Sequence, residues 1–218
     1  MKTVGVVLSG CGFLDGAEIH ESVLTLYFLD RAGARAICMA PNRPQAKVVN
    51  HLTGEVDPAD TRNVLWESAR IARGDIRDLK DANPEDLDAL ILPGGFGAAL
   101  NLCDFAEKGA QGSVDPDLEA LVRAMHGAGK PIGAICIAPA VIALVLGAEG
   151  PRLTIGSDPD TAAALAAAGA SHVERSAKED LVDAETRIVT TPAYMCGTGP
   201  AEVGAGIEKL VTDLLALA

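Results

Sequence analysis

The chain has 218 residues, 49% of them hydrophobic and 22% charged, which is typical of one globular domain long enough to bury a sizeable core. Its formal net charge of −12 argues against nucleic acid and against an anionic membrane surface as partners, because both attract basic faces. No two of its five cysteines form a C-x-x-C pair, so no zinc site is indicated. An odd, scattered set suits a reducing compartment, and we expect a cytoplasmic location. The cysteines are Cys11, Cys38, Cys103, Cys136 and Cys196.

The N-terminal part of the chain has the pattern of a strand, a helix and a second strand. The continuous apolar run Val4–Leu8 predicts a strand buried on both faces, and it is too short for the core of a signal peptide. A dinucleotide-binding loop would need a third glycine where Asp15 stands, so we expect no nucleotide cofactor. A helix over Glu18–Asp30 and a strand over Ala34–Ala40 follow.

The next segment, 42–86, is long for a connection between a strand and the next strand. Val48–Val56 has the pattern of a small hairpin, and Thr61–Arg73 that of an amphipathic helix. His51 lies near the predicted turn and is expected to be a solvated or structural side chain. We interpret the segment as an insertion that covers part of the molecule or contacts a partner.

Strands and helices alternate through the rest of the chain. This alternation predicts an α/β fold in which a doubly wound, mainly parallel sheet carries helices on both faces, as one domain over 1–218. We predict strands at Leu87–Leu92, Ile132–Ile135 and Leu153–Ile155, a hairpin of His172–Arg175 with Arg187–Thr191 through Asp183–Glu185, and helices at Asp117–His126, Pro139–Leu146, Thr161–Ala168 and Ala201–Leu217.

Cys136 stands between the predicted strand Ile132–Ile135 and the predicted helix from Pro139, with no residues to spare for a loop. A sharp strand-to-helix turn exposes its central side chain, as in a nucleophile elbow, and the helix N-terminus favours a thiolate with a lowered pKa. Two other interpretations are a cysteine that fills the core and a membrane span over 132–148. Pro131 and Pro139 argue against the span.

In parallel sheets, ligands bind beyond the carboxyl ends of the strands. Glu18 or Glu21, the Gly94–Gly95 turn and Cys136 all follow such ends or open the next helix, so we expect them to converge. A glycine cluster at this position lets backbone N–H groups approach a ligand closely.

These motifs resemble the DJ-1/PfpI superfamily, whose fold is flavodoxin-like and similar to class I glutamine amidotransferases. The resemblance to its ElbB branch, also called isoprenoid-biosynthesis glyoxalase, sigma cross-reacting protein or ES1-like, covers essentially the whole chain. It is carried by Ser9–Gly12, Asp15–Gly16, Glu18–Glu21, Asn50–Glu55, Thr61–Val64, Pro93–Gly95, Ala134–Pro139 and Thr190–Met195.

The resemblance implies a glyoxalase that needs no cofactor, acts on glyoxal and similar small aldehydes, and works as a homodimer. It gives Cys136 the nucleophile position, Glu21 the position of the carboxylate beside it, and Gly95 and Ile137 the backbone positions of an oxyanion hole. Possible pocket residues are Gly94, Cys11, Glu18, His20, Asn63 and Tyr194.

One departure concerns histidine. Many members of the superfamily place a histidine directly after the cysteine or on a later loop, but position 137 is Ile, and 155–158 contains no histidine. We therefore expect a Cys136–Glu21 dyad. His20 is a possible substitute, although neighbours on a helix face different directions.

In this mechanism the thiolate adds to an aldehyde, backbone N–H groups hold the oxyanion, and Glu21 moves a proton between the two carbons. Two alternatives stay open. The pattern His172-Val173-Glu174 matches the His-x-Glu of a glutamine amidotransferase, and the same thiolate would suit a non-enzymatic, oxidation-sensing protein.

Overall fold

The computed structural model describes all 218 residues, and its central sheet has seven strands in the order β3-β2-β1-β4-β5-β9-β8. Neighbouring strands are parallel except at one edge, where β8 runs antiparallel to β9. A separate pair, β6 and β7, is parallel. The strands are β1 (Thr3–Val7), β2 (Arg35–Ala40), β3 (Ile76–Asp78), β4 (Ala89–Leu92), β5 (Ile132–Ile135), β6 (Arg152–Leu153), β7 (Ser171–His172), β8 (Leu181–Asp183) and β9 (Ile188–Thr191).

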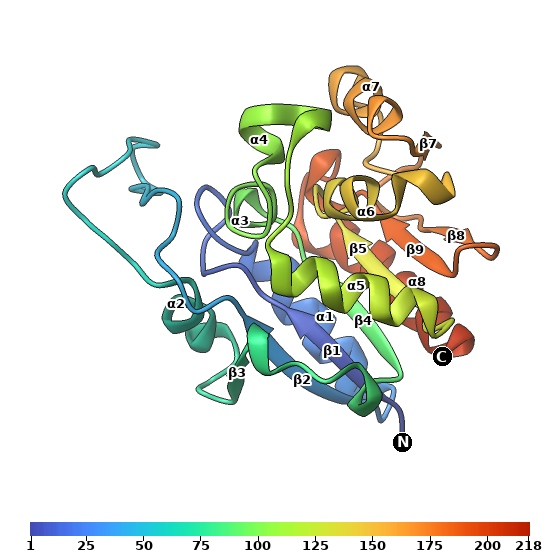
Figure 1. Cartoon of the computed structure of the whole chain (residues 1–218). Coiled ribbons are helices and arrows are strands. Elements are labelled where there is room, and N and C mark those ends of the chain that lie inside the picture. The colour runs from blue at the N-terminus through green and yellow to red at the C-terminus, as the bar shows by residue number, and fades with distance from the viewer.

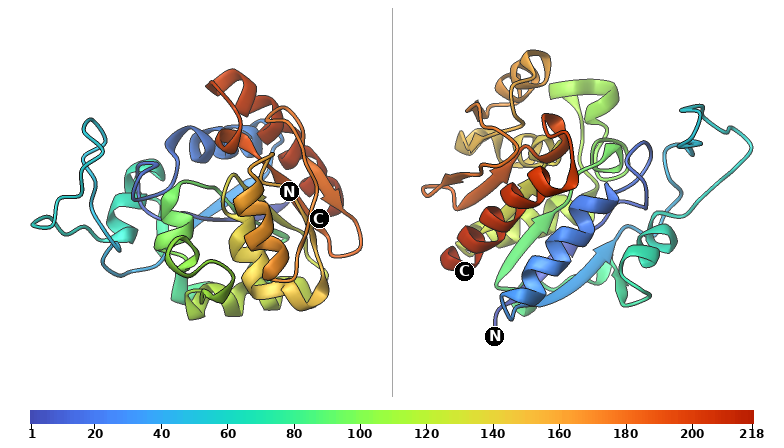
Figure 2. Two further views of the ribbon diagram at one scale, coloured as in Figure 1. Left: turned by 90° about the horizontal axis from the view of Figure 1, so that it is seen from above. Right: turned by 180° about the vertical axis from the view of Figure 1, so that it is seen from behind.

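Helices cover both faces of the sheet, as the alternating sequence pattern predicts. α5 and α6 lie on one face (Figure 1), and α1 and α8 lie together on the opposite face (Figure 2). The helices are α1 (Ile19–Arg31), α2 (Val64–Ile71), α3 (Phe96–Leu100), α4 (Phe105–Lys108), α5 (Pro116–Gly127), α6 (Pro139–Leu146), α7 (Pro159–Ala167) and α8 (Pro200–Leu217).

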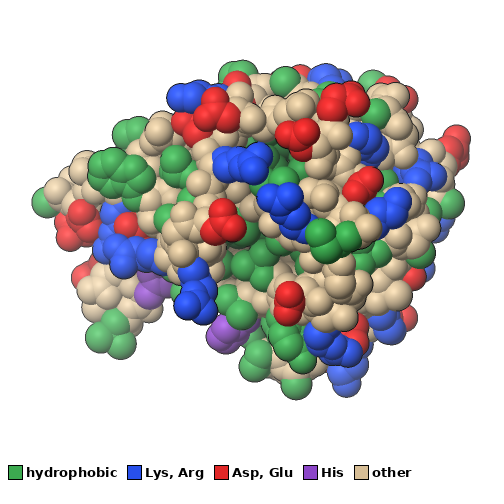
Figure 3. Space-filling model, turned by 90° about the horizontal axis from the view of Figure 1, so that it is seen from below, with side chains coloured by type: hydrophobic (Ala, Val, Ile, Leu, Met, Phe, Trp, Pro, Cys, Tyr) green, Lys and Arg blue, Asp and Glu red, His purple; other side chains and the backbone are tan.

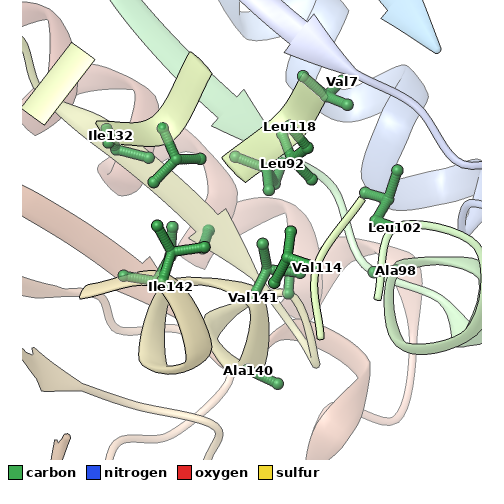
Figure 4. Packing of buried hydrophobic residues seen from close by; sticks show 14 of the residues in the cluster. Val7, Leu92, Ala98, Leu102, Val114, Leu118, Ile132, Ala140, Val141 and Ile142 are labelled. Atoms are coloured by element: carbon green, nitrogen blue, oxygen red, sulfur yellow. The ribbon is translucent and has the colours of Figure 1, made fainter. Parts of the chain in front are cut away.

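The core has two parts because successive side chains of a buried strand point to opposite faces. The larger part contains 31 buried residues, with Val7, Leu92 and Ile132 of the sheet lying toward Leu118 and Ile142 of the helices (Figure 4). The second part contains 20 buried residues on the other face. Because helices cover both faces of the sheet, the side chains on both faces of each strand are buried, and the strand sequences are continuous apolar runs.

The hairpin prediction was wrong about one strand. β9 does form an antiparallel pair, but its partner is β8 rather than His172–Arg175. Asp183 ends β8, and its carboxylate accepts a hydrogen bond from the Thr186 hydroxyl at 2.7 Å, which holds the turn into β9. The predicted turn therefore exists, but it joins β8 to β9. His172 belongs instead to β7, which pairs with β6 in the separate sheet.

The segment 42–86 is only partly an insertion. Its second half supplies α2, which confirms the helix predicted within Thr61–Arg73. It also supplies the edge strand β3, which was not predicted. The expected hairpin is reduced to one isolated bridge between Val49 and Val56. All residues from 50 to 62 are exposed, and this excursion projects from the body of the molecule (Figure 1). Its ends stay together because the Gln45 N–H donates to the Arg62 carbonyl at 2.7 Å.

Charged side chains of both signs are interspersed over the face shown in Figure 3, with apolar side chains between them. None of the helices combines the length and hydropathy that crossing a membrane requires. The apolar run 132–148, which was weighed as a span, forms β5 and α6.

Candidate active site

Cys136 lies at the joint between β5 and α6. Its backbone adopts a φ of +62°, a left-handed conformation that is strained for a residue with a side chain. The Cys136 N–H donates to the Thr191 carbonyl at 2.9 Å, which ties the joint to the end of β9. This is the elbow geometry that the sequence predicts, and it places the thiol at the carboxyl end of the sheet.

The backbone N–H groups of Gly95 and Ile137 lie beside the Cys136 sulfur and act to lower its pKa. They come from the turn after β4 and from the residue that follows the cysteine. Backbone donors fixed in this way stabilise negative charge on the sulfur or on an oxygen that forms next to it.

Glu21 lies in the first turn of α1 and is completely buried. Its carboxyl group accepts hydrogen bonds from the N–H groups of Gly94 at 2.9 Å and Tyr194 at 3.3 Å, and it lies beside the Cys136 thiol, whose pKa it affects. Glu18 caps the same helix, with its carboxylate accepting from the Glu21 N–H at 2.7 Å. The dyad predicted from the sequence is thus brought together by α1, the β4 turn, the elbow and the β9 loop.

Gly94 allows the two groups to meet. A Cβ at this position would lie 2.4 Å from the Cys136 Cβ, 2.7 Å from the Glu21 Oε2 and 2.8 Å from the Ile135 carbonyl oxygen. No side chain fits in that space, so the glycine is required by close approach.

We expect Gly94→Ala to lower the free energy of unfolding by roughly 1–3 kcal/mol, the usual cost of overpacking a buried site. Gly127→Ala is the matched control, because a Cβ there meets nothing within 4 Å and Gly127 ends a helix without a positive φ. Urea denaturation of both variants checks this. Equal stability of the two would contradict the close approach at Gly94.

The pKa of Cys136 differs from the expectation, whereas that of Glu21 agrees with it. Burial and the neighbouring Glu18 carboxylate raise the pKa of Glu21 to about 8, as a carboxyl group removed from water should show. The pKa of Cys136, expected to be lowered, is instead raised well above its usual value by burial and by the Glu21 charge, although the N–H groups of Gly95 and Ile137 oppose this. The two groups repel when both are ionised, so they titrate as a pair.

A cavity of about 630 Å³ opens over Cys136. Within it, the His20 Nδ1 and the Tyr194 hydroxyl are 2.7 Å apart, so His20 lies close to the dyad through Tyr194 rather than against the sulfur. Burial and the Glu18 and Glu21 carboxylates raise the pKa of Tyr194, which keeps its hydroxyl protonated. The lining residues are Phe13, Glu18, His20, Gly95, Phe96, Cys136, Ile137, Thr161, Tyr194 and Met195.

Three suggested pocket residues do not line the cavity. Asn63 caps α2, with its side chain accepting from the Trp66 N–H. Cys11 lies near Glu67 and Arg70, and burial raises its pKa. Gly94 lies behind the dyad rather than in the cavity wall.

The sequence analysis missed four lining residues. Phe13 and Phe96 follow the glycine-containing turns after β1 and β4, and that position was the available signal. Thr161 and Met195 enter from α7 and the β9 loop, for which the sequence carries no comparable signal. No group of three or more histidine, cysteine or acidic side chains is arranged to hold a metal ion.

Comparison with known proteins decides the family. The model of the DJ-1/PfpI family matches residues 11–195. The chain belongs to the DJ-1/PfpI family. Its β-sheet, helices and elbow are those of the flavodoxin-like, class I glutamine amidotransferase-like fold expected from the resemblance.

Curated and solved members of the family resemble the whole chain. The human "Glutamine amidotransferase-like class 1 domain-containing protein 3, mitochondrial" is 44% identical over 98% of this chain and 82% of its own length. The rat "ES1 protein homolog, mitochondrial" is 43% identical over 98% of this chain and 83% of its own. A crystal structure of an "isoprenoid biosynthesis protein with amidotransferase-like domain" from Ehrlichia chaffeensis superposes with a TM-score of 0.93 at 35% identity, covering 100% of this chain and 99% of that one.

Proposed function

We propose that the protein is a glyoxalase that converts small dicarbonyls such as glyoxal to 2-hydroxy acids without glutathione or another cofactor. The observation that carries the proposal is the Cys136–Glu21 pair beneath a cavity, with two backbone N–H groups on the sulfur. These are the nucleophile, proton carrier and oxyanion donors that the reaction needs.

The first step is addition. The Cys136 sulfur attacks one aldehyde carbon, and the carbonyl electrons move to the oxygen to give a hemithioacetal. The N–H groups of Gly95 and Ile137, which act on the sulfur, would bind that oxygen. As Cys136 attacks, its proton passes through the Glu21 carboxylate to the new oxygen, which leaves Glu21 ionised for the next step.

The second step moves hydrogen between the two carbons. Glu21 removes the proton from the carbon bonded to sulfur and returns a proton to the neighbouring carbon, so the first carbon is oxidised while the second is reduced. The result is a 2-hydroxy thioester. Water then hydrolyses it to glycolate and the free thiol, and no external oxidant or reductant enters.

A turnover assay in D2O tests both the activity and this route. We expect glutathione-free conversion of glyoxal to glycolate, with deuterium on the carbon that bears the hydroxyl group, because the proton passes through an exchangeable carboxyl group. Glycolate without deuterium would indicate a direct hydride shift. Absence of turnover with glyoxal and methylglyoxal would contradict the proposal.

The amidotransferase alternative is disfavoured by position. His172 pairs with β6 in the separate two-stranded sheet and does not line the cavity over Cys136. Ammonia release from glutamine that is lost in His172→Ala would restore this alternative. A purely redox role predicts peroxide-sensitive Cys136 without aldehyde turnover.

All five cysteines are free, which suits any reducing compartment. The cytoplasm remains our proposal for this chain, while the curated relatives are mitochondrial by name.

We also propose a homodimer, as the resemblance to the family implies. α1 presents an apolar stripe to solvent, formed by Ile19, Val23 and Tyr27 at intervals of four residues, with exposed fractions of 43%, 48% and 52%. A twofold axis across this helix would bury both copies of the stripe.

We expect sedimentation at micromolar concentration to show a dimer for the wild type and a monomer for Val23→Glu, because a twofold contact would bury the new charge twice. Trp66→Glu is the control, since Trp66 is 72% exposed on α2 and does not belong to the stripe. A wild-type monomer would contradict the proposed assembly.

A further inference from the structure

The cavity over Cys136 is much larger than glyoxal requires. Glyoxal consists of two carbons and two oxygens, whereas a volume of about 630 Å³ is that of a pocket for a ligand with many heavy atoms. A small dicarbonyl bound at the sulfur would leave most of the apolar wall uncovered.

The wall is mainly hydrophobic, with two aromatic rings on one side. Phe13 and Phe96 both line the cavity and are each 48% exposed. Large apolar side chains that stay half-exposed beside a reactive group are a favourable contact for an apolar ligand. Six of the ten lining residues are hydrophobic.

The two rings are held in place rather than free to collapse. The Phe96 N–H donates to the Phe13 carbonyl at 2.7 Å, which joins the two turns. The His51 ring contacts Phe13 edge-on with centroids 5.6 Å apart, and the Lys47 ammonium lies 5.8 Å from the Phe96 centroid. Preorganised side chains lose little entropy when a ligand binds.

Polar lining groups are few. They are Glu18, His20, the Tyr194 hydroxyl and Thr161, and the first three belong to α1 and the β9 loop beside the dyad. A ligand that fits this wall has one polar reacting end and one apolar end.

We propose that the cavity selects 2-oxoaldehydes whose ketone carbon carries an aryl or bulky alkyl group. This inference rests on the proposed glyoxalase function and names its substrate class. The sulfur adds to the aldehyde carbon, hydrogen moves from that carbon to the ketone carbon, and water releases the 2-hydroxy acid, so the reaction again needs no external oxidant.

The first test compares phenylglyoxal with methylglyoxal. We expect kcat/KM to be at least about tenfold higher for phenylglyoxal, because even one added methylene in an apolar pocket is worth tenfold or more. Mandelate, the product from phenylglyoxal, should inhibit more strongly than lactate. Equal kcat/KM values and equal inhibition would overturn the inference.

Variants separate pocket recognition from the intrinsic reactivity of the two substrates. Phe13→Ala should lower the ratio of the two kcat/KM values by about tenfold, since the missing ring contacts only the larger substituent. Trp66→Ala removes an aromatic ring that does not line the cavity and should leave the ratio unchanged. An unchanged ratio in Phe13→Ala would count against the aromatic wall.

A second measurement does not depend on turnover. Bromoacetone and phenacyl bromide alkylate thiols with small and aryl groups, and their rates at Cys136 can be divided by their rates with free cysteine. We expect the normalised rate to favour phenacyl bromide in the wild type and to lose this preference in Phe13→Ala. A preference for phenacyl bromide without dicarbonyl turnover would refute the proposed function but support apolar recognition. Dicarbonyl turnover without that preference would support the proposed function but refute apolar recognition.

Discussion

Replacing Cys136 with alanine should abolish the conversion of glyoxal, lowering kcat/KM by a factor on the order of 10⁴ or more, the scale of losing a nucleophile. Without the sulfur no hemithioacetal forms, so the N–H groups of Gly95 and Ile137 have no oxyanion to stabilise. Product formation measured by chromatography, with glycolate quantified directly, checks this. Substantial turnover by Cys136→Ala would exclude the covalent mechanism.

Cys38 provides the matched control. It lies on β2, is 7% exposed as Cys136 is, and burial raises its pKa to about 11. Cys38→Ala should retain most of the activity, because the side chain only fills the core. Circular dichroism of both variants should show folded protein.

Replacing Glu21 with glutamine should lower turnover by roughly 10²–10⁴, the usual loss when a general acid–base is removed. Glutamine keeps an oxygen to accept from the Gly94 N–H at 2.9 Å, but an amide nitrogen cannot accept the longer bond from the Tyr194 N–H. The expected stability cost of that lost contact is about 1 kcal/mol near neutral pH. Normal turnover in Glu21→Gln would assign the proton transfer to another group.

The same substitution should change how stability depends on pH. The pKa of Glu21 is raised from 4.5 to about 8 in the folded protein, so between these values the folded state holds a proton that the unfolded state has lost. Stability from this group is therefore full below about pH 4.5 and falls as pH rises, with a slope of up to about 1.4 kcal/mol per pH unit. Urea denaturation from acid to alkaline pH should show this slope in the wild type, and Glu21→Gln should flatten it.

Glu21→Gln should slow turnover but speed the alkylation of Cys136. The Glu21 carboxylate raises the pKa of the thiol, so above about pH 8 Glu21→Gln should react faster with iodoacetamide than the wild type, although its turnover is lower. Glu18→Gln is the related control, because removing the Glu18 charge lowers the pKa of Glu21 without removing the proton carrier. Its pH–rate profile should move toward acid.

Much of the fold could be predicted because its signals are local. Buried parallel strands are continuous apolar runs, and the elbow follows from the absence of a loop between Ile135 and Pro139. The hairpin error and the missed strand β3 have a common cause. Short edge strands of two or three residues bury few side chains, so their pairing depends on the surrounding structure more than on sequence pattern.

The dyad could be located from the sequence, but its titration could not. Proximity to a helix N-terminus favours a low thiol pKa, and this is visible in the order of residues. Complete burial of Glu21 and its contact with the sulfur depend on three segments far apart in the chain, and burial outweighs the helix terminus. The cavity walls at Thr161 and Met195 were equally unpredictable, because α7 and the segment after β9 meet only in the folded protein.

The exposed excursion over 50–62 is attached in a way that makes it separable from the domain. Its ends meet at Gln45 and Arg62, so a protease cut within it, or a short turn that replaces it, would leave the path into α2 unchanged. One side chain of the excursion opposes a clean deletion. His51, within the excursion, accepts from the Leu14 N–H at 3.2 Å, and its Nε2 lies 3.9 Å from the buried Asp15 carboxylate, so a deletion would remove these contacts. Removing the loop would therefore also remove the edge-on contact of the His51 ring with Phe13.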